Sequence, residues 1–317
     1  MICLTPLRVT SCYERIGGRP DHGAGGVVKP SPFRYSRPES VTEALVLLDD
    51  EAKVLAGGQS LIPLLNMRLA APEHLVDINR LTELSYVETA NGAVRIGALA
   101  RHAEVLACES AAAAQPLLRQ ALRWVAHPAV RNRGTTVGSL VHGDPAGEMP
   151  AVLALLGGTV RVASIAGERA IPASDFFLGP LETALEPGEL AIDAEFPALA
   201  RSGSGTGFAE ISRRRGDYAV CGVAALAWLG PDGRVGGASA AYLSMGPVPV
   251  VLDLTEAVAG AAADAATFPA AAGLARDRLD PQPDIHATAS YRRHLAGVLT
   301  ERALLAALAD ARETVAA

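Results

Sequence analysis

Cysteine is scarce in this sequence, and its few residues stand far apart. Four occur in 317 residues, Cys3, Cys12, Cys108 and Cys221, and no two of them form a C-x-x-C pair. A structural zinc site or an iron–sulfur cluster requires several cysteines at short spacing. The sequence therefore argues against both kinds of site in this chain. Scattered thiols fit a reducing compartment, and we expect a cytoplasmic protein.

Long apolar runs and an excess of positive charge are missing as well. Half of the residues are apolar, but no run reaches the roughly 18 residues of a membrane span. The 28 basic residues are outnumbered by 34 acidic ones, which gives a formal net charge of −6. Because binding to a phosphate backbone requires a broad cationic surface, we expect no nucleic-acid partner. We also expect no membrane span.

The first 26 residues, MICLTPLRVTSCYERIGGRPDHGAGG, differ in kind from the rest. They contain no continuous apolar segment followed by a cleavage site, so a secretory signal does not fit. We expect residues 1–27 to be a poorly ordered N-terminal extension. The alternative is an artefact of start-site choice, because Val27 or Val28 could be the initiating residue.

From Pro38 onward, short helices and strands alternate. Ser40 can cap a helix from Val41 to Leu48, whose apolar residues recur at i, i+3, i+4 and i+7. The other expected helices are 61–69, 101–108, 116–125 and 151–156, and the expected strands are 53–56, 75–78, 93–98, 159–163 and 190–196. This mixture predicts an α+β domain over residues 28–202, divided into two subdomains near residue 80.

The Gly- and Ser-rich segment ALARSGSGTG, residues 198–207, is the best candidate for a domain boundary. After it we expect three antiparallel strands, at 208–211, 218–229 and 235–244. An alanine-rich helix pair at 257–275 and a final helix at about 289–312 follow. Residues 206–312 are thus predicted to form a C-terminal α/β domain with a three-stranded antiparallel sheet and helices.

Two glycine-bearing turns stand out, AGGQS at residues 56–60 and GTTVGS at residues 134–139. Glycine accepts positive φ and lets an anion approach main-chain amides without a Cβ in the way. The first turn opens a helix, whose N-terminal amides and dipole favour negative charge. Each turn alone favours a structural role. Together they favour a dinucleotide site, with Asp144 or Glu148 as the carboxylate for a ribose hydroxyl.

Other chemical motifs are weak. The sequence has no G-x-x-x-x-G-K-[ST], no G-x-G-x-x-G and no G-x-S-x-G. His102, His127 and His142 lie in three separate segments without metal-ligand spacing, and Cys221 lies in an apolar strand pattern that indicates an inert thiol. We therefore predict neither metal ligands nor catalytic residues. The run 213–215 (RRR) is either a solvated turn or a clamp on an anionic cofactor or partner.

Six motifs in a fixed order give the chain a family resemblance. They are VLAGGQSLIPLLNMRLA, LVDINRL, RIGALARHAEV, HPAVRNRGTTVGSLVHGDPAGEMPA, DFFLGPL and RRRGDYAVCGVA, followed by DIHATASYRRHLAGVLTERAL. In these motifs, from about Lys29 to about Arg312, the chain resembles the FAD-binding medium subunit of the molybdenum hydroxylases. That family includes the flavoprotein subunits of carbon monoxide, xanthine and aldehyde dehydrogenases.

The resemblance implies a fold and a cofactor site. The fold would be a two-part FAD-binding module of the vanillyl-alcohol oxidase/p-cresol methylhydroxylase type, followed by a separate C-terminal domain. The residues that would grip the FAD pyrophosphate and ribityl chain are Ala56, Gly57, Gly58, Gln59, Ser60, Leu61, Thr135, Thr136, Val137, Gly138 and Ser139. Glu148, or alternatively Asp144, would hold the adenosine ribose. Leu178, Arg214, Asp217 and Tyr218 would lie near the isoalloxazine ring.

The resemblance also implies electron transfer rather than substrate chemistry in this chain. FAD would take electrons from the [2Fe–2S] clusters of a small subunit, after a molybdenum-cofactor large subunit has oxidised the substrate, and pass them to an external acceptor. The expected assembly is a dimer of heterotrimers. NAD, oxygen and quinone stay open as acceptors. Two other functions stay open, a stand-alone FAD oxidase or dehydrogenase and a flavin-free scaffold or maturation protein.

Val137 departs from the family pattern, which has two adjacent glycines where this chain has Val137-Gly138. A β-branched residue adopts positive φ only at a considerable energetic cost. Since the flanking motifs are retained, we predict that residue 137 has negative φ and that glycine is dispensable there.

Overall fold

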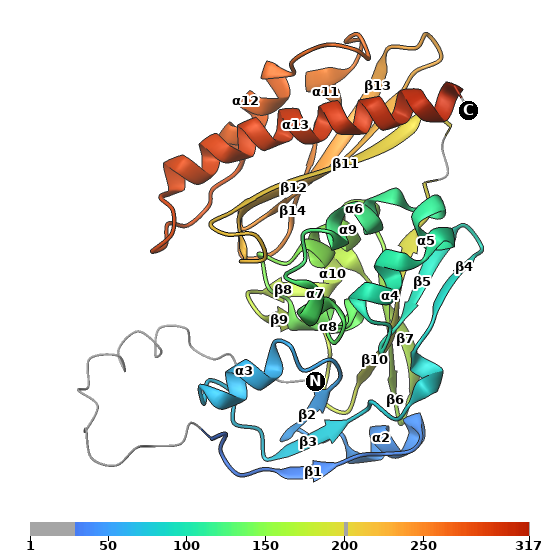
Figure 1. Cartoon of the computed structure of the whole chain (residues 1–317), viewed down its shortest axis with the longest axis vertical. Helices are drawn as coiled ribbons and strands as arrows, with labels where there is room; N and C mark the ends of the chain where they lie inside the picture. The colour runs from blue at the N-terminus through green and yellow to red at the C-terminus, as the bar shows by residue number, and fades with distance from the viewer. Residues whose placement is uncertain (1–28, 200–201, 317) are drawn as a thin grey trace.

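The computed structural model describes residues 29–199 and 202–316, which form an α+β fold with three main sheets, one above the other in Figure 1. The extension expected at residues 1–27 lies outside the described residues. No helix in the described ranges combines the length and apolar character that crossing a bilayer requires.

The first sheet is parallel, with strand order β1-β3-β2. Its elements are β1 (Arg34–Ser36), α2 (Val41–Leu47), β2 (Ala52–Leu55), α3 (Leu61–Asn66) and β3 (His74–Asp77). The predicted cap of α2 is confirmed, since the Ser40 hydroxyl accepts a hydrogen bond from the Glu43 amide at 3.1 Å. Helix α3 is shorter than predicted, and Arg68 beyond its end has a left-handed φ of 55°.

The second sheet is antiparallel, with order β4-β5-β10-β6-β7. Its strands are β4 (Val87–Ala90), β5 (Ala93–Gly97), β6 (Thr159–Ser164), β7 (Gly167–Pro172) and β10 (Leu190–Pro197). Asn91 and Gly92 join β4 to β5 with φ of 53° and 75°, as in a type I′ hairpin. The sequence did not reveal β4 and β7, because both are edge strands with mostly exposed side chains and lack the alternating apolar pattern.

Along the chain, short helices and one hairpin separate the strands of the second sheet, and in space they lie beside it (Figure 1). They are η2 (Thr82–Leu84), α4 (His102–Ala107), α5 (Glu109–Ala114), α6 (Pro116–Leu122), α7 (Pro128–Arg131), α8 (Thr136–His142), α9 (Glu148–Leu156), α10 (Ala173–Phe176) and the hairpin strands β8 (Phe177–Gly179) and β9 (Glu182–Thr183). Helix α8 corrects the prediction that residues 134–139 form a turn, because residues 136–139 are its first turn.

The third sheet has four strands rather than the predicted three, in the order β11-β12-β13-β14. Its elements are β11 (Ser204–Ser212), β12 (Ala219–Leu229), β13 (Val235–Leu243), β14 (Val250–Asp253), α11 (Thr255–Val258), α12 (Pro269–Arg278) and α13 (Ala289–Ala316). Strand β14 was missed because it has only four residues, lies at the sheet edge and follows Pro249, a residue that disfavours strands.

Two glycines of the segment predicted to be a domain boundary belong to β11 and allow close helix packing. A Cβ on Gly205 would lie 2.2 Å from the Ala307 carbonyl oxygen, and one on Gly207 would lie 2.1 Å from the Ala303 carbonyl oxygen. Helix α13 therefore lies directly on the backbone of β11, as Figure 1 shows. In this segment, glycine serves sheet–helix packing and not only chain flexibility.

The third sheet is covered on both faces. Helices α12 and α13 bury the face that contains Cys221 and Val223, which confirms the buried position predicted for Cys221. The opposite face packs against helices α6 and α9, with α6 contacting β11 and α9 contacting β12, β13 and β14. We call this second contact the domain seam. It brings residues of the C-terminal sheet close to the end of α9 where Glu148 lies.

A buried carboxylate joins three strands of the second sheet. Asp193 on β10 is fully buried and accepts hydrogen bonds from Arg95 on β5 (2.7 Å), Arg161 on β6 (2.8 Å) and the Tyr86 hydroxyl (2.7 Å). Both arginine side chains are 34% exposed, so their charges stay partly hydrated. The cluster ties the central strand to both neighbours.

Replacing Asp193 by alanine should leave two arginines without their buried counter-ion. We expect Asp193→Ala to lower the free energy of unfolding by about 3 kcal/mol, measured by urea denaturation of the purified chain. Glu195→Ala, on the same strand but exposed, should change it by less than about 0.5 kcal/mol. Equal costs for the two variants would contradict a stabilising role for the cluster.

Candidate functional site

The two glycine turns identified in the sequence touch each other. A Cβ on Gly57 would lie 2.3 Å from the Arg133 carbonyl oxygen and 2.8 Å from Gly134 Cα. Such distances do not occur for a real side chain, so glycine is required at residue 57 for the two backbones to approach. Gly58 has a second role, since its φ of +74° is the left-handed conformation that glycine adopts without strain.

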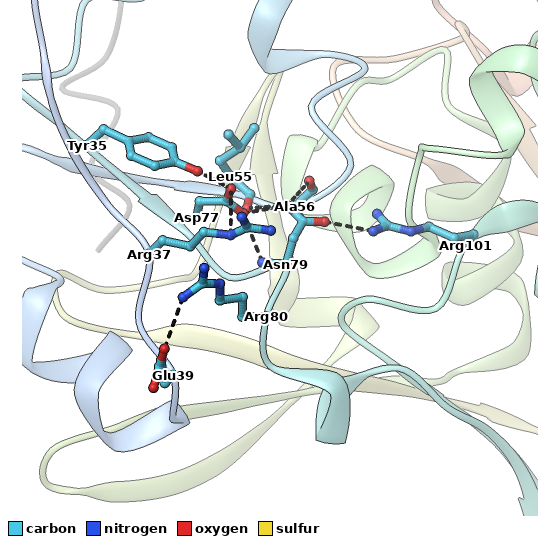
Figure 2. Close-up of polar contacts among 9 residues, drawn as sticks. All are labelled: Tyr35, Arg37, Glu39, Leu55, Ala56, Asp77, Asn79, Arg80 and Arg101. Atoms are coloured by element: carbon cyan, nitrogen blue, oxygen red, sulfur yellow. Dashed lines mark hydrogen bonds and ion pairs between the residues drawn. The ribbon is translucent and has the colours of Figure 1, made fainter.

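Asn79 and Arg101 hold the two turns together, and Figure 2 shows the bonds of Asn79 to Ala56 and to Arg101. The Asn79 side-chain amide donates to the Ala56 carbonyl oxygen at 2.8 Å and its Oδ1 accepts from Arg101 Nη2 at 2.7 Å. Arg101 Nη1 donates to the Arg133 carbonyl oxygen at 2.9 Å. One amide and one guanidinium thus connect the loop after β2 to the loop before α8.

Asp77 supports Asn79 from the end of β3. Its Oδ1 accepts from the Asn79 side chain at 2.6 Å, its Oδ2 accepts from the Tyr35 hydroxyl at 2.5 Å, and Arg37 lies 3.6 Å away. Burial alone would raise the pKa of Asp77, but these hydrogen bonds and the Arg37 charge hold it below its usual range. Figure 2 also shows Arg80 paired with Glu39 beside this cluster. Asp77 is therefore a carboxylate that fixes the loop carrying Asn79.

Main-chain amides at the start of α3 and α8 supply hydrogen-bond donors. The amides of Gln59, Ser60 and Leu61 make no hydrogen bond to another described residue, and neither does that of Val137. In α8 the Thr135 hydroxyl accepts from the Gly138 amide at 3.1 Å, which caps the helix. Because the two turns touch, these donors come from two sides, as a bound pyrophosphate requires.

The backbone conformation of Val137 explains why a valine fits where the family pattern has a glycine. Val137 is the second residue of α8, has negative φ and is 2% exposed in the main core. The predicted negative φ is confirmed. A valine is compatible with this position because it lies inside a helix, where a β-branched side chain costs only a fraction of a kcal/mol.

The C-terminal end of α8 positions the other predicted site residues. Gly143 ends the helix with φ of 64°, and its carbonyl oxygen accepts from the Leu181 amide in the β8–β9 hairpin at 3.0 Å. That hairpin carries Leu178, which is 59% exposed. Asp144 follows Gly143 and accepts a hydrogen bond from the Ala146 amide at 2.8 Å, so it shapes its own loop.

Asp144, Glu148 and Tyr218 lie within electrostatic range of one another. Burial and then the neighbouring Asp144 carboxylate raise the pKa of Glu148 to about 7, while a hydrogen bond from its own backbone amide and the Arg131 charge oppose the shift. Desolvation, and then Asp144 and Glu148, raise the pKa of Tyr218, although 67% of this residue is exposed. A carboxylate can accept further hydrogen bonds, for example from a sugar hydroxyl.

The turn between β11 and β12 carries Arg214, Asp217 and Tyr218 and packs against His127. A Cβ on Gly216, whose φ is +88°, would lie 2.6 Å from the His127 ring. The Arg214 carbonyl oxygen accepts from the Asp217 amide at 3.0 Å, and its side chain is exposed. The turn is therefore well defined. The Arg213 side chain lies 3.6 Å from Asp217, so this arginine of the run is part of the turn itself.

Sequence reasoning did not single out the residues that join the turns. Asn79 and Arg101 were absent from the predicted site, although Asn79 lies in LVDINRL and Arg101 in RIGALARHAEV, both quoted as motifs. A polar pair directly after a buried strand, as in Asp77 and Asn79, is a usable signal. His102 was considered only as a metal ligand. It is buried, bonds Thr136 through Nδ1 at 3.1 Å, and burial lowers its pKa to about 4.

Comparison with known families identifies two parts of the chain. Residues 31–199 match the family described as "FAD binding domain in molybdopterin dehydrogenase". Residues 206–307 match the family described as "CO dehydrogenase flavoprotein C-terminal domain". The donor set described above fits the cofactor named in the first description, since it offers backbone amides from two helix starts and two carboxylates, Asp144 and Glu148, after α8.

Individual relatives match over nearly their full length. The alpha subunit of the 6-hydroxypseudooxynicotine dehydrogenase complex of Paenarthrobacter nicotinovorans is 40% identical, over 90% of this chain and 98% of that protein. A solved carbon monoxide dehydrogenase of Hydrogenophaga pseudoflava is similar with a TM-score of 0.81 and 35% identity, over 89% of this chain and 99% of that one. Quinoline 2-oxidoreductase of Pseudomonas putida 86 gives a TM-score of 0.83 and 36% identity, over 90% and 99%.

The helical position of Val137 leads to a test. We expect Val137→Gly to lower the free energy of unfolding of the FAD-free chain by about 2 to 4 kcal/mol in urea denaturation, since a buried side chain is lost and glycine weakens a helix. Val46→Gly, at an exposed position of α2, is the control and should cost about 0.5 kcal/mol. A Val137→Gly variant that is as stable as the parent and binds FAD more tightly would contradict this interpretation.

Proposed function

Because this chain belongs to the FAD-binding medium subunits of the molybdenum hydroxylases, we propose that it is the electron-transfer subunit of such an oxidoreductase. In the proposed complex, a molybdenum-cofactor large subunit oxidises the substrate and a small subunit carries [2Fe–2S] clusters. This chain receives electrons from those clusters and passes them to an external acceptor. We further propose a dimer of heterotrimers in the cytoplasm. The match to both family descriptions and to complete relatives supports the proposal.

The contact between Gly57 and the Arg133–Gly134 backbone is the observation that most supports a cofactor role. We propose that the FAD pyrophosphate and ribityl chain bind at this contact. The proposed binding residues are Ala56, Gly57, Gly58, Gln59, Ser60, Leu61, Thr135, Thr136, Val137, Gly138 and Ser139. Backbone donors at helix starts suit a phosphate because the helix dipole adds to their hydrogen bonds. Arg101 and Arg133 add positive charge nearby.

The carboxylates after α8 suit the adenosine ribose. We propose Glu148 as the acceptor for a ribose hydroxyl, with Asp144 as the second candidate. The position of Glu148 at the start of α9, beside Asp144 and Arg131, supports this, because a carboxylate accepts hydrogen bonds from hydroxyl groups. Asp144 is less available, since one oxygen already accepts from the Ala146 amide.

We propose that the isoalloxazine ring lies near Leu178, Arg214, Asp217 and Tyr218. The exposure of Leu178 and Tyr218, 59% and 67%, supports this, because two large apolar side chains are left in solvent on segments that meet α8 and the domain seam. Bound flavin would supply the ability to accept single electrons and deliver a pair. The chain's own residues then have to position the ring and exclude water, and a nucleophile is not needed.

The finer architecture also belongs to the proposal. We propose that the first two sheets form the two-part FAD module of the vanillyl-alcohol oxidase/p-cresol methylhydroxylase type, divided near residue 80. Residues 28–202 and 206–312 are the proposed domains. The change from a parallel to an antiparallel sheet between β3 and β4 supports the division near residue 80. Substrate selection would lie in the large subunit.

The proposed function is tested by isolating the native complex through a tag on this chain. We expect FAD, iron and molybdenum in the purified material, with flavin and iron–sulfur absorbance that bleaches when substrate is oxidised. FAD without molybdenum and iron would indicate a stand-alone flavin enzyme. A chain that carries no FAD, even after incubation with the free cofactor, would indicate a scaffold and contradict the proposal.

The Gly57 contact is tested by a single methyl group. We expect Gly57→Ala to weaken FAD binding at least tenfold, measured by quenching of flavin fluorescence. The added Cβ would collide with the backbone of Arg133 and Gly134, which can move only if the whole loop before α8 moves. The control is Gly273→Ala in α12, where a Cβ meets no atom within 4 Å. FAD affinity of Gly57→Ala equal to that of the control would exclude a role of this contact in binding.

A further inference from the structure

A carboxyl group that the proposed function does not use is buried in the domain seam. Glu210 on β11 is 5% exposed, and its Oε2 has no hydrogen-bond partner among the described residues. A buried carboxylate without a partner is costly, whereas a neutral carboxylic acid is much less so. The Glu210 side chain therefore lies at a position that disfavours its ionised form.

The register of the sheet fixes the direction of Glu210. Ile211 pairs with Cys221, whose side chain is buried on the α13 face, so the neighbouring Glu210 and its partner Gly222 lie on the opposite face. That face packs against the FAD-binding part of the chain. A Cβ on Gly222 would lie 3.4 Å from Glu210 Cγ, so the glycine leaves the room that the Glu210 side chain occupies.

The Asp144–Glu148 loop docks beside this pair of strands. The Ser244 amide at the end of β13 donates to the Pro145 carbonyl oxygen at 2.9 Å. The Ser244 hydroxyl donates to the Ala219 carbonyl oxygen at 2.7 Å, which ties the loop to the start of β12. Glu148 is close enough to Glu210 that its negative charge acts on the Glu210 carboxyl group. The register agrees with this, since Glu210 pairs with Gly222 and Gly222 pairs with Leu243, the residue before Ser244.

The other charged groups around the seam do not neutralise both acids. The positive charge of Arg131 lowers the pKa of Glu148. On the same side, Asp144 adds a negative charge and Tyr218 adds a neutral phenol. On β12, Cys221 is a neutral thiol, and Arg292 beyond it is paired with Asp284 at 2.5 Å. Among the described residues, Arg131, Asp144 and the two glutamates thus share this region with His142, whose Nε2 lies 4.0 Å from Asp144 Oδ2 and whose pKa burial lowers.

We propose that Glu210 is a positioning residue of the cofactor site, which stays a neutral carboxylic acid and so lets the Glu148 carboxylate remain docked at the seam. This inference rests on the proposed role of Glu148 in holding the ribose. Ionisation of Glu210 places a second negative charge against Glu148 in a region of low dielectric. The loop then loosens from β11–β13, and the domain seam and the FAD site weaken together.

The proposal gives the pH dependence a definite sign. Burial and then Glu148 raise the pKa of Glu210 to about 9, above its unfolded value. Between the unfolded pKa of 4.5 and the folded pKa of about 9, the folded chain therefore binds more protons than the unfolded chain. Its free energy of unfolding falls as pH rises through this interval. Glutamine, which is neutral at every pH and has nearly the same shape, should remove that fall.

The first experiment uses the full chain without FAD. Thermal unfolding is measured from about pH 7 to about pH 9.5 for the parent, Glu210→Gln and Glu313→Gln, whose glutamate is exposed on α13. We expect the melting temperatures of the parent and Glu313→Gln to fall by several degrees more than that of Glu210→Gln. Parallel curves for all three chains would overturn the proposal.

The second experiment measures FAD affinity over the same pH range. For the parent, we expect the Kd to rise at least fivefold toward alkaline pH, and for Glu210→Gln the Kd should be flat. A parent that binds FAD with the same pH dependence as Glu210→Gln overturns this inference but leaves the proposed function intact. Failure of both chains to bind FAD at any pH instead contradicts the proposed function.

A third measurement uses only the parent chain, in case Glu210→Gln does not fold. Infrared spectra of the FAD-free parent near neutral pH should contain the carbonyl band of a protonated carboxylic acid, which disappears on titration toward about pH 10. The absence of such a band at neutral pH would overturn the proposal.

Discussion

The close approach of two backbones at Gly57 is the contact on which the rest of the site depends. A side chain at this position would push the loop after β2 away from Arg133 and Gly134. With glycine there, Asn79 and Arg101 can bond both loops at once, and the starts of α3 and α8 come together. Amide donors from two helices then converge, an arrangement that neither helix could offer alone.

Helix α8 connects the contact at Gly57 to the β8–β9 hairpin and to the loop that carries Glu148. Its first turn contributes donors beside Gly57, and its last residue, Gly143, holds the β8–β9 hairpin. The loop after it leads to Glu148 and docks on the C-terminal sheet through Ser244. A helix of seven residues thus connects the proposed pyrophosphate, ribose and ring regions. The C-terminal domain belongs to the proposed cofactor site, because it contacts the loop that carries the proposed ribose ligand.

Much of the fold follows from local patterns, and the errors have physical causes. The cap at Ser40, the Asn91-Gly92 turn and the buried strand around Cys221 were predicted from residue type and period. Strands β4, β7 and β14 were missed because edge strands are held by backbone pairing, which leaves little apolar pattern. Gly205 was interpreted only as part of a domain boundary, but it also allows contact with α13, which lies about 100 residues further along the chain.

The sequence alone determined the family resemblance, the cofactor class and the two glycine turns, because these depend on short motifs whose chemistry is local. It also predicted the negative φ of Val137, since a β-branched residue tolerates few alternatives. Only the tertiary structure decided that Asn79 and Arg101 join the turns and that Glu210 faces the part of the chain that carries Glu148. Those pairs come from distant segments, and which distant side chains face each other depends on how sheets and helices pack.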